Sequence, residues 1–266
     1  MSELKNPLEV YKLLPQSNCG QCYLPTCLAF SAAVIKGDKK LADCPPLASS
    51  TTDQPAEKVL ARESTDRQLA QHLASLSRDV EAIDLSVAAQ RTGGYFAGGK
   101  LAVQCLGKDF WVDQAGQVSS QCHTHAGLTI PLLSYIVQSK GGDLSGNWVP
   151  FRELKNGAAM SPLFVKRCEK PLKLIADTHT DLFADLVSMF SGQRTANQFA
   201  ADISLVLYPL PKLPVLICYW QPEDDLASAI NIFFDATAEN HLNIESIFAL
   251  GTGLVMMFEK IVRQHI

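Results

Sequence analysis

Apolar and polar residues recur along the chain with two different periods, which separates helical segments from extended ones. Residues 57–91 carry Leu69, Leu73 and Leu76 at spacings of four and three, which predicts a mainly helical stretch. Residues 100–119 hold short apolar runs separated by glycine-containing turns, a pattern typical of antiparallel strands in a meander. A pair of glycines between the two stretches ends the helical pattern.

The second half of the chain mixes helical and extended patterns. We predict helices over residues 128–138 and 161–191, the second with a break near Pro171, strands over residues 203–208, 214–220 and 230–234, and a closing helix after Asn243. Pro209 is expected in the turn between the first two strands, because a proline cannot donate to the ladder of a central strand. Pro150 places residues 146–151 in a loop or an edge strand for the same reason. Helices and antiparallel strands in mixed order predict an α+β fold.

Composition divides the chain into three regions. Residues 1–46 hold four of the eight cysteines, and the other four are scattered along the rest of the chain. Residues 47–56 are rich in Ser and Thr and contain few packing residues, which is typical of a linker. We therefore predict a small helical domain over residues 1–46, a linker over residues 47–56, and a larger domain over residues 57–266 with mainly antiparallel strands.

Composition and charge exclude several classes of protein. Hydrophobic residues make up 47% of the chain and the formal net charge is −4, with no basic block, so we expect a globular protein without a nucleic-acid partner. The sequence has neither a run of 18 apolar residues nor a signal-peptide pattern, so we expect no membrane insertion and no export. In a reducing cytoplasm the cysteines are expected to remain thiols or to bind metal.

Cys19, Cys22, Cys27 and Cys44 form the densest group of metal-binding side chains. Their spacing, Cys-x2-Cys-x4-Cys-x16-Cys, places three thiolates close together in sequence and brings the fourth from a returning segment. Four thiolates are the ligands that a [4Fe-4S] cluster requires. Structural zinc is the main alternative, although zinc sites usually combine two short Cys pairs, or Cys with His, and the second short pair is missing here.

The residues around these cysteines predict how the segment folds. Asn6 followed by Pro7 is typical of a helix start. Thr26 is a typical N-cap for a second helix that begins at Cys27 and ends at Gly37. With Cys27 in the first helical turn, free backbone N–H groups and the positive end of the helix are expected to face an anionic cluster.

A family resemblance adds to this reading of the cysteine motif. It is carried by three stretches: Leu14-Pro15-Gln16-Ser17-Asn18-Cys19-Gly20-Gln21-Cys22, Pro25-Thr26-Cys27-Leu28-Ala29-Phe30 and Asp43-Cys44-Pro45-Pro46. Together they resemble the small [4Fe-4S] domain at the N-terminus of the large subunit of the corrinoid iron–sulfur protein of acetyl-CoA synthesis. A similar domain occurs in the B subunit of Rnf-type electron transport complexes.

The resemblance covers about the first 46 residues and implies a low-potential electron-transfer protein of an anaerobe, linked to corrinoid or one-carbon metabolism. The remainder, particularly residues 146–154 and 233–241, is similar to an uncharacterised domain that often follows this cluster domain. One departure is visible, because the family usually has Gly-Tyr-Pro after the second cysteine and this chain has Tyr23-Leu24-Pro25. The lost glycine is expected to change the local turn or to bring an aromatic ring close to the cluster.

Cys122-His123-Thr124-His125 is the densest group of potential ligands outside the motif. Alternate residues of an extended segment point the same way, so His123 and His125 are candidate cofactor-binding residues. Their cofactor would be a corrinoid or another tetrapyrrole. A polar loop after the meander is the plain alternative.

The other polar and thiol groups have structural explanations. We expect His179 to be an exposed residue at a helix end, Glu223, Asp224 and Asp225 to form a solvated turn, His241 to lie in a surface loop, and Cys105, Cys168 and Cys218 to be core thiols. The sequence contains no nucleophile elbow, kinase signature or His-Glu-x-x-His motif, so catalytic residues stay unassigned.

The sequence thus favours a soluble iron–sulfur electron carrier, or a component of a reductase, over a stand-alone enzyme. Its expected partner is a redox protein, and a homodimer is compatible with the sequence. Two alternatives remain open. In the first, the C-terminal domain binds a corrinoid or another tetrapyrrole that the cluster reduces. In the second, zinc occupies the four cysteines and the protein is structural or serves as an interaction module.

Overall fold

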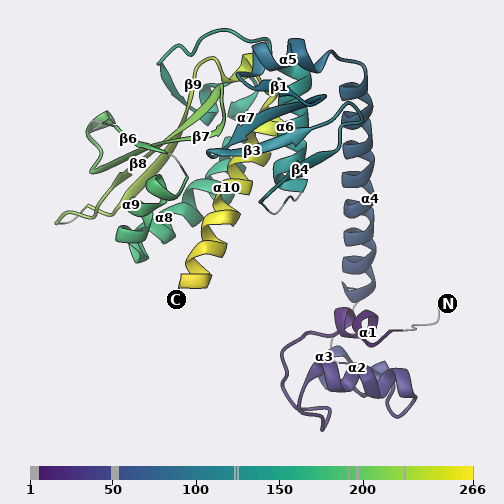
Figure 1. Ribbon diagram of the computed structural model, residues 1–266. Helices are drawn as coiled ribbons and strands as arrows, with labels where there is room; N and C mark the ends of the chain where they lie inside the picture. Colours follow the sequence, from purple (N-terminus) through teal and green to yellow (C-terminus); the bar gives the residue numbers. More distant parts are fainter. Residues whose placement is uncertain are drawn as a thin grey trace. The chain divides into compact units, whose positions relative to one another are not determined.

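The computed structural model describes residues 6–48, 54–122, 124, 126–190, 192–195, 198–224 and 226–265 (Figure 1). The chain divides into two compact units, Met1–Ala70 and Gln71–Ile266. Helix α4 (Gln54–Glu81) contains the residue at which they are divided, and it begins within the stretch expected to be a linker. Helices combined with antiparallel sheets confirm the predicted α+β class.

The N-terminal unit is built from short helices. They are α1 (Pro7–Leu13), α2 (Cys27–Lys36), the 3-10 turn η1 (Leu41–Asp43) and α3 (Pro45–Ala48). The Leu8 N–H donates to the Asn6 side chain at 3.0 Å, and the Ala29 N–H donates to the Thr26 hydroxyl oxygen at 3.1 Å. Gly37 ends α2 in the left-handed conformation. Both predicted caps and the predicted helix end are confirmed.

The larger unit begins with a meander. Helix α5 (Leu85–Thr92) packs on a sheet with strand order β1-β2-β3-β4, all antiparallel, formed by β1 (Tyr95–Ala97), β2 (Lys100–Cys105), β3 (Lys108–Val112) and β4 (Val118–Ser120). The last three strands are the predicted ones. Strand β1 was not predicted, because its three exposed residues lie between two glycine pairs and have no alternating pattern.

A second antiparallel sheet has the strand order β5-β9-β8-β7-β6. Its strands are β5 (Trp148–Pro150), β6 (Gln193–Arg194), β7 (Ile203–Leu210), β8 (Leu213–Trp220) and β9 (Ala229–Asp235). Strand β5 lies at the sheet edge, as Pro150 predicts. The expected position of Pro209 was wrong: it lies inside β7, where the register shifts between Leu207 and Leu210. Where a ladder is irregular, one residue needs no N–H partner, and a proline can occupy that position. Strand β7 therefore continues through Pro209 to Leu210, and the turn to β8 contains only Pro211 and Lys212.

Several helices of the larger unit pack on this second sheet or on one another. They are α6 (Ala126–Gln138), α7 (Gly157–Phe164), the π-helical turn η3 (Val165–Glu169), α8 (Lys170–Thr178), α9 (Thr180–Met189) and α10 (Ile244–His265), with 3-10 turns η2 (Phe151–Glu153), η4 (Gln198–Ala200) and η5 (Ala238–Asn240). The helical break lies at His179, whereas Pro171 lies in the first turn of α8. Within the described part of the chain, no helix has the length and apolar composition needed to span a bilayer.

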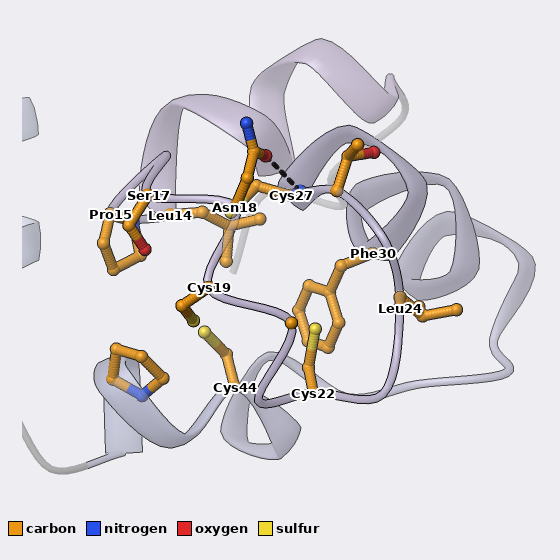
Figure 2. Close-up of a pocket in the computed structure, with 13 residues that line it drawn as sticks. Leu14, Pro15, Ser17, Asn18, Cys19, Cys22, Leu24, Cys27, Phe30 and Cys44 are labelled. Carbon is orange, nitrogen blue, oxygen red and sulfur yellow. Dashed lines mark hydrogen bonds between the residues drawn. The ribbon is translucent and has the colours of Figure 1, made fainter.

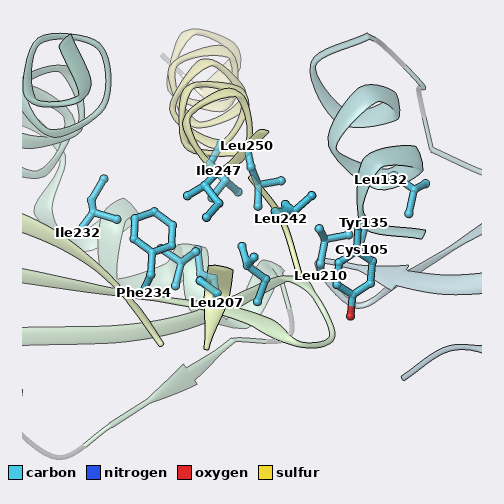
Figure 3. Close-up of a cluster of buried hydrophobic side chains, with 14 of the residues drawn as sticks. Cys105, Leu132, Tyr135, Leu207, Leu210, Ile232, Phe234, Leu242, Ile247 and Leu250 are labelled. Carbon is cyan, nitrogen blue, oxygen red and sulfur yellow. The ribbon is translucent and has the colours of Figure 1, made fainter. Parts of the chain in front are cut away.

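The main core lies between one face of the five-stranded sheet and helices α6, α8 and α10 (Figure 3). Alternate residues of β7, β8 and β9, such as Leu207, Ile217 and Phe234, point into it and are buried. Ile247 and Leu250 of α10 meet them from the helical layer. This period-two burial matches the apolar pattern of the strands.

Helix α10 approaches α7 and η3 closely at Gly251. A Cβ atom there would lie 2.9 Å from the ring of Phe164 and 3.4 Å from the Cys168 Sγ. The Phe164 ring stacks on Phe151, with centroids 4.2 Å apart and planes within 4°. The missing side chain of Gly251 therefore makes room for a stacked aromatic pair under the sheet.

Candidate metal centre

The loop between α1 and α2 uses an unusual number of left-handed residues. Gln16, Asn18, Gly20 and Tyr23 have φ angles of 56°, 48°, 70° and 63°. The Tyr23 N–H donates to the Gly20 carbonyl at 2.9 Å and closes a tight turn between Cys19 and the start of α2. For residues other than glycine, such conformations cost about 1–2 kcal/mol each. The loop therefore holds a shape that its own backbone preferences do not favour.

Asn18 joins this loop to the start of α2. The Cys27 N–H donates to the Asn18 Oδ1 at 2.8 Å (Figure 2). The Ser31 hydroxyl donates to the Cys27 carbonyl at 2.8 Å. The Cys27 N–H is therefore not one of the free N–H groups in the first turn of α2 that were expected to face a cluster. The neutral side chain of Asn18 thus satisfies the Cys27 N–H. Because Asn18 directly precedes Cys19, this bond also fixes Cys27 relative to Cys19.

All four cysteines of the motif line one hollow in the N-terminal unit (Figure 2). Cys22, Cys27 and Cys44 are buried, whereas Cys19 is exposed. Other walls of the hollow come from apolar side chains that include Leu14, Phe30 and Pro46. Residues 27 and 44, which lie far apart in sequence, are thus brought to the same place by α2 and by the turn η1 that precedes Cys44.

The thiols at the two ends of the motif have different surroundings. Hydrogen bonds from the Gln21 N–H and the Ser17 side chain lower the pKa of the exposed Cys19 thiol. Burial raises the pKa of the Cys44 thiol, a bond from the Leu47 N–H opposes this, and the nearby Cys22, Cys27 and Cys19 raise it further. Several thiolates in this hollow would repel one another unless a cation neutralised them.

The donor set fits an iron–sulfur cluster. Such a cluster takes four thiolates that surround it, with hydrogen bonds to sulfur and an apolar shell. The hollow offers four thiols, N–H donors from Gln21 and Leu47, and apolar walls. Within the described ranges, no group of three or more His, Cys, Asp or Glu side chains is arranged to hold a single metal ion.

Tyr23 occupies the position at which the resemblance led us to expect glycine. Its φ of 63° is a left-handed conformation, which explains why glycine suits this position. The side chain is 93% exposed. The expectation that the lost glycine brings an aromatic ring close to the thiols was therefore wrong, because the ring points into solvent instead.

The second predicted site lies outside the described residues. His123 and His125 are not among them, so their role as cofactor-binding residues stays a prediction. Cys122 and Thr124, which are described, are both exposed. Asp225 also lies outside the described residues, and its neighbours Glu223 and Asp224 are exposed.

His241 is a correction to the sequence analysis, which placed it in a surface loop. Its side chain is buried, and its Nδ1 lies 2.9 Å from the Ser139 Oγ at the end of α6. Among the described residues, its Nε2 has no hydrogen-bond partner. Burial lowers the pKa of His241, Lys212 lowers it further, and Asp235 opposes the shift. The polar neighbours in sequence hid this burial, because it depends on a contact 102 residues away.

The remaining cysteines of the larger unit are confirmed as core thiols. Cys105, Cys168 and Cys218 are buried. Burial raises the pKa of each, to about 12 for Cys168. Neutral thiols of this kind are poor nucleophiles and poor metal ligands. His179 is a half-exposed residue at the end of α8, near its expected place.

A small cysteine-lined module followed by a larger α+β domain defines a two-part class of protein, and comparison with known proteins agrees. The chain belongs to the family described as "Domain of unknown function (DUF3786)", whose model matches residues 84–257. Residues 14–46 match a second model, described as "Putative Fe-S cluster". The cluster domain and the uncharacterised domain recognised from sequence are both confirmed.

Curated relatives match the N-terminal segment. The "Acetyl-CoA decarbonylase/synthase complex subunit gamma 2" of Methanosarcina mazei is 53% identical over 45 residues, which is 17% of this chain and 10% of that protein. The "Corrinoid/iron-sulfur protein large subunit" of Moorella thermoacetica is 53% identical over 38 residues, 14% of this chain and 8% of that protein. The chain thus spans about a tenth of the length of these relatives. No solved structure matches the chain. The resemblance to Rnf-type B subunits stays a prediction.

Proposed function

We propose that Cys19, Cys22, Cys27 and Cys44 bind one [4Fe-4S] cluster and that the protein transfers single electrons at low potential. The observation that carries this proposal is the single hollow lined by all four thiols. The match of residues 14–46 to an iron–sulfur family model supports it. When bound, such a cluster accepts and releases one electron at a time. The proposed cluster domain ends near residue 46, as the motif does.

The surroundings of the thiols suit this role. The Gln21 N–H at Cys19 and the Leu47 N–H at Cys44 would donate to ligand sulfurs, which stabilises negative charge and raises the reduction potential. The apolar side chains of Leu14 and Phe30 limit contact with water, which acts in the opposite direction. The balance between these two effects sets the potential of the site.

Electron exchange needs a route to a partner. Cys19 is the exposed cysteine of the motif, so the cluster would approach the surface at this ligand. We therefore propose that a redox protein docks over the Cys19 side of the hollow. The relatives named for acetyl-CoA decarbonylase/synthase complexes and for corrinoid/iron–sulfur protein support a link to corrinoid or one-carbon metabolism. A cytoplasmic location, where thiols stay reduced, belongs to the same proposal.

Protein prepared without oxygen tests the cluster. We expect about four iron atoms and four sulfides per chain, a broad visible absorption that dithionite bleaches, and an electron paramagnetic resonance signal after reduction. Cys27→Ala is expected to abolish these signals, whereas Cys122→Ala, the matched change at an exposed cysteine outside the motif, is expected to keep them. One zinc and no iron per chain would establish the structural alternative instead.

The corrinoid alternative has a separate test. Cobalamin is added to the full chain, and its visible spectrum is followed with and without His123→Ala and His125→Ala. A spectral change that both substitutions remove would assign these histidines to the cofactor. An unchanged spectrum would leave the electron carrier as the better account of the protein.

A further inference from the structure

A cavity of about 280 Å³ lies in the larger unit, at the edge of the five-stranded sheet. One wall is the sheet surface near Phe233 and Trp220, and the other is formed by η2, α7 and η3. Strand β5 ends at Pro150, one residue before this wall begins. The cavity therefore opens where the edge strand stops and β9 has no further strand beside it.

The wall on the sheet side is aromatic. Phe199 stacks on Phe233 with centroids 4.5 Å apart and planes within 18°, and it leaves 51% of its own surface exposed. Its φ of 54° is left-handed, which a bulky residue rarely adopts. Strained residues of this kind are concentrated at active sites, ligand clamps and switch regions. A flat ring is thus held open to solvent beside the cavity.

Glu169 supplies an acceptor on the opposite wall. It is half-buried and ends the π-helical turn η3, a feature often found at functional sites. One carboxylate oxygen, Oε1, accepts from the Ile232 N–H of β9 at 3.2 Å. Burial raises the pKa of this carboxyl, and the bond from Ile232 and the charge of Arg152 oppose the shift.

Nothing described in the protein neutralises this carboxylate at close range. Among the described residues, Glu169 forms no ion pair, and Arg152 instead lies 3.8 Å from Glu153 with both side chains largely exposed. Ionised carboxylates act only as acceptors, and the bond from the Ile232 N–H goes to one of the two oxygens of Glu169. A ligand that brings an N–H group or a positive charge would compensate the burial of Glu169.

We propose that this cavity binds a small planar nitrogen heterocycle, which stacks on the aromatic wall and donates N–H hydrogen bonds to Glu169. The volume is just below the range of about 300–1,000 Å³ typical of ligand sites, which suits one or two fused rings. This site lies wholly within the larger unit and does not depend on the proposed cluster.

Two matched probes test the chemistry on the full chain. When its ring nitrogen is protonated, 2-aminoquinoline can donate one hydrogen bond from that nitrogen and one from its amino group to the same carboxylate, whereas 2-methylquinoline has nearly the same shape and lacks the amino donor. We expect calorimetry to show at least tenfold tighter binding of 2-aminoquinoline. Equal affinities, or no binding of 2-aminoquinoline at millimolar concentration, would overturn the proposal without any substitution.

Substitutions then assign the site. Glu169→Gln keeps an oxygen that can accept from the Ile232 N–H, and it should weaken 2-aminoquinoline at least tenfold, while Glu153→Gln, outside the cavity lining, should leave the affinity unchanged. Phe199→Ala should weaken both probes, and Phe96→Ala, an exposed aromatic residue of β1, should weaken neither. Affinities that do not change with Glu169→Gln or Phe199→Ala would place the probe elsewhere and refute this site.

Discussion

The two units of the chain have hydrophobic cores of different composition. Among the described side chains of the N-terminal unit, the buried cluster at the hollow has five members, of which three are cysteines and the other two are Leu14 and Phe30. In the larger unit, a continuous core of aliphatic and aromatic side chains fills the space between a sheet and several helices (Figure 3). The first core consists largely of ligands, whereas the second consists of packing residues.

This difference indicates that metal binding stabilises the N-terminal unit and that apolar packing stabilises the larger unit. Very small domains rarely bury enough apolar surface to fold alone and usually need a metal, disulfides or a partner. The N-terminal loop also contains left-handed residues that oppose its folded shape. We therefore expect the N-terminal unit to depend on metal and the larger unit to be indifferent to it.

The largest expected effect is the loss of one ligand. Cys44→Ala should abolish iron binding and unfold the N-terminal unit, because binding energies of about 10–16 kcal/mol accompany the folding of small metal domains. Limited proteolysis should then cut within residues 6–48, while the thermal transition of the larger unit stays in place. Cys122→Ala is the control. If Cys44→Ala left the N-terminal unit resistant to protease, its core would be sufficient without metal.

The next effect belongs to the larger unit. Phe234 is fully buried and contacts the rings of Phe151 and Phe164. Phe234→Ala should lower the free energy of unfolding by about 3–5 kcal/mol, measured with denaturant, because it leaves a cavity in the main core. Phe96→Ala, at a half-exposed ring, should cost far less. Iron content should be the same in both variants, and its loss in Phe234→Ala would contradict the separation of the two units.

A smaller effect depends on pH. Burial lowers the pKa of His241 below its ordinary value of about 6.5, so the unfolded chain takes up this proton first as the pH falls. The contribution of neutral His241 to stability is therefore present above about pH 6.5 and is lost below it, by up to about 1.4 kcal/mol per pH unit. His241→Gln should flatten the pH dependence of unfolding between about pH 7.5 and 5.5. An unchanged slope would mean that the folded protein also protonates His241.

The smallest effect concerns the strained loop. Tyr23→Gly should relieve a left-handed conformation and stabilise the N-terminal unit by about 1 kcal/mol, which corresponds to about fivefold slower iron release to a chelator. Tyr23→Ala removes the same ring but keeps the strain, so it should release iron at the wild-type rate. Equal rates for the glycine and alanine variants would show that backbone strain at residue 23 does not limit the lifetime of the cluster.

Local signals in the sequence predicted much of both units. The caps at Asn6 and Thr26 depend on neighbours within three residues, and so does Asn243, whose side chain accepts from the Ser246 N–H at 2.8 Å. The four thiols were found by spacing alone. Features that depend on distant contacts were missed or misplaced: Pro209 fits a strand because of a register shift, and His241 is buried through Ser139.

The cavity beside Glu169 shows the same limit. Its aromatic and acidic walls come from segments that are separated by many residues and are brought together by the pairing of β5 with β9. The π-helical turn that presents Glu169 has no signature in the apolar pattern. The left-handed backbone at residue 199 could not be predicted either, because the residue there is Phe and not the glycine or asparagine that usually indicates such a conformation.

Gly251 has a consequence for how this family can vary. Helix α10 leaves no room for a side chain there because the ring of Phe164, which also lines the cavity, fills the space. The side chains of residues 164 and 251 therefore compete for the same space in the core. Residue 164 lines the cavity, whereas residue 251 lies far from it in sequence. Across relatives, we expect the two positions to covary, with a larger residue at 251 accompanied by a smaller one at 164. Such pairs would indicate which members of the family have cavities of a different depth.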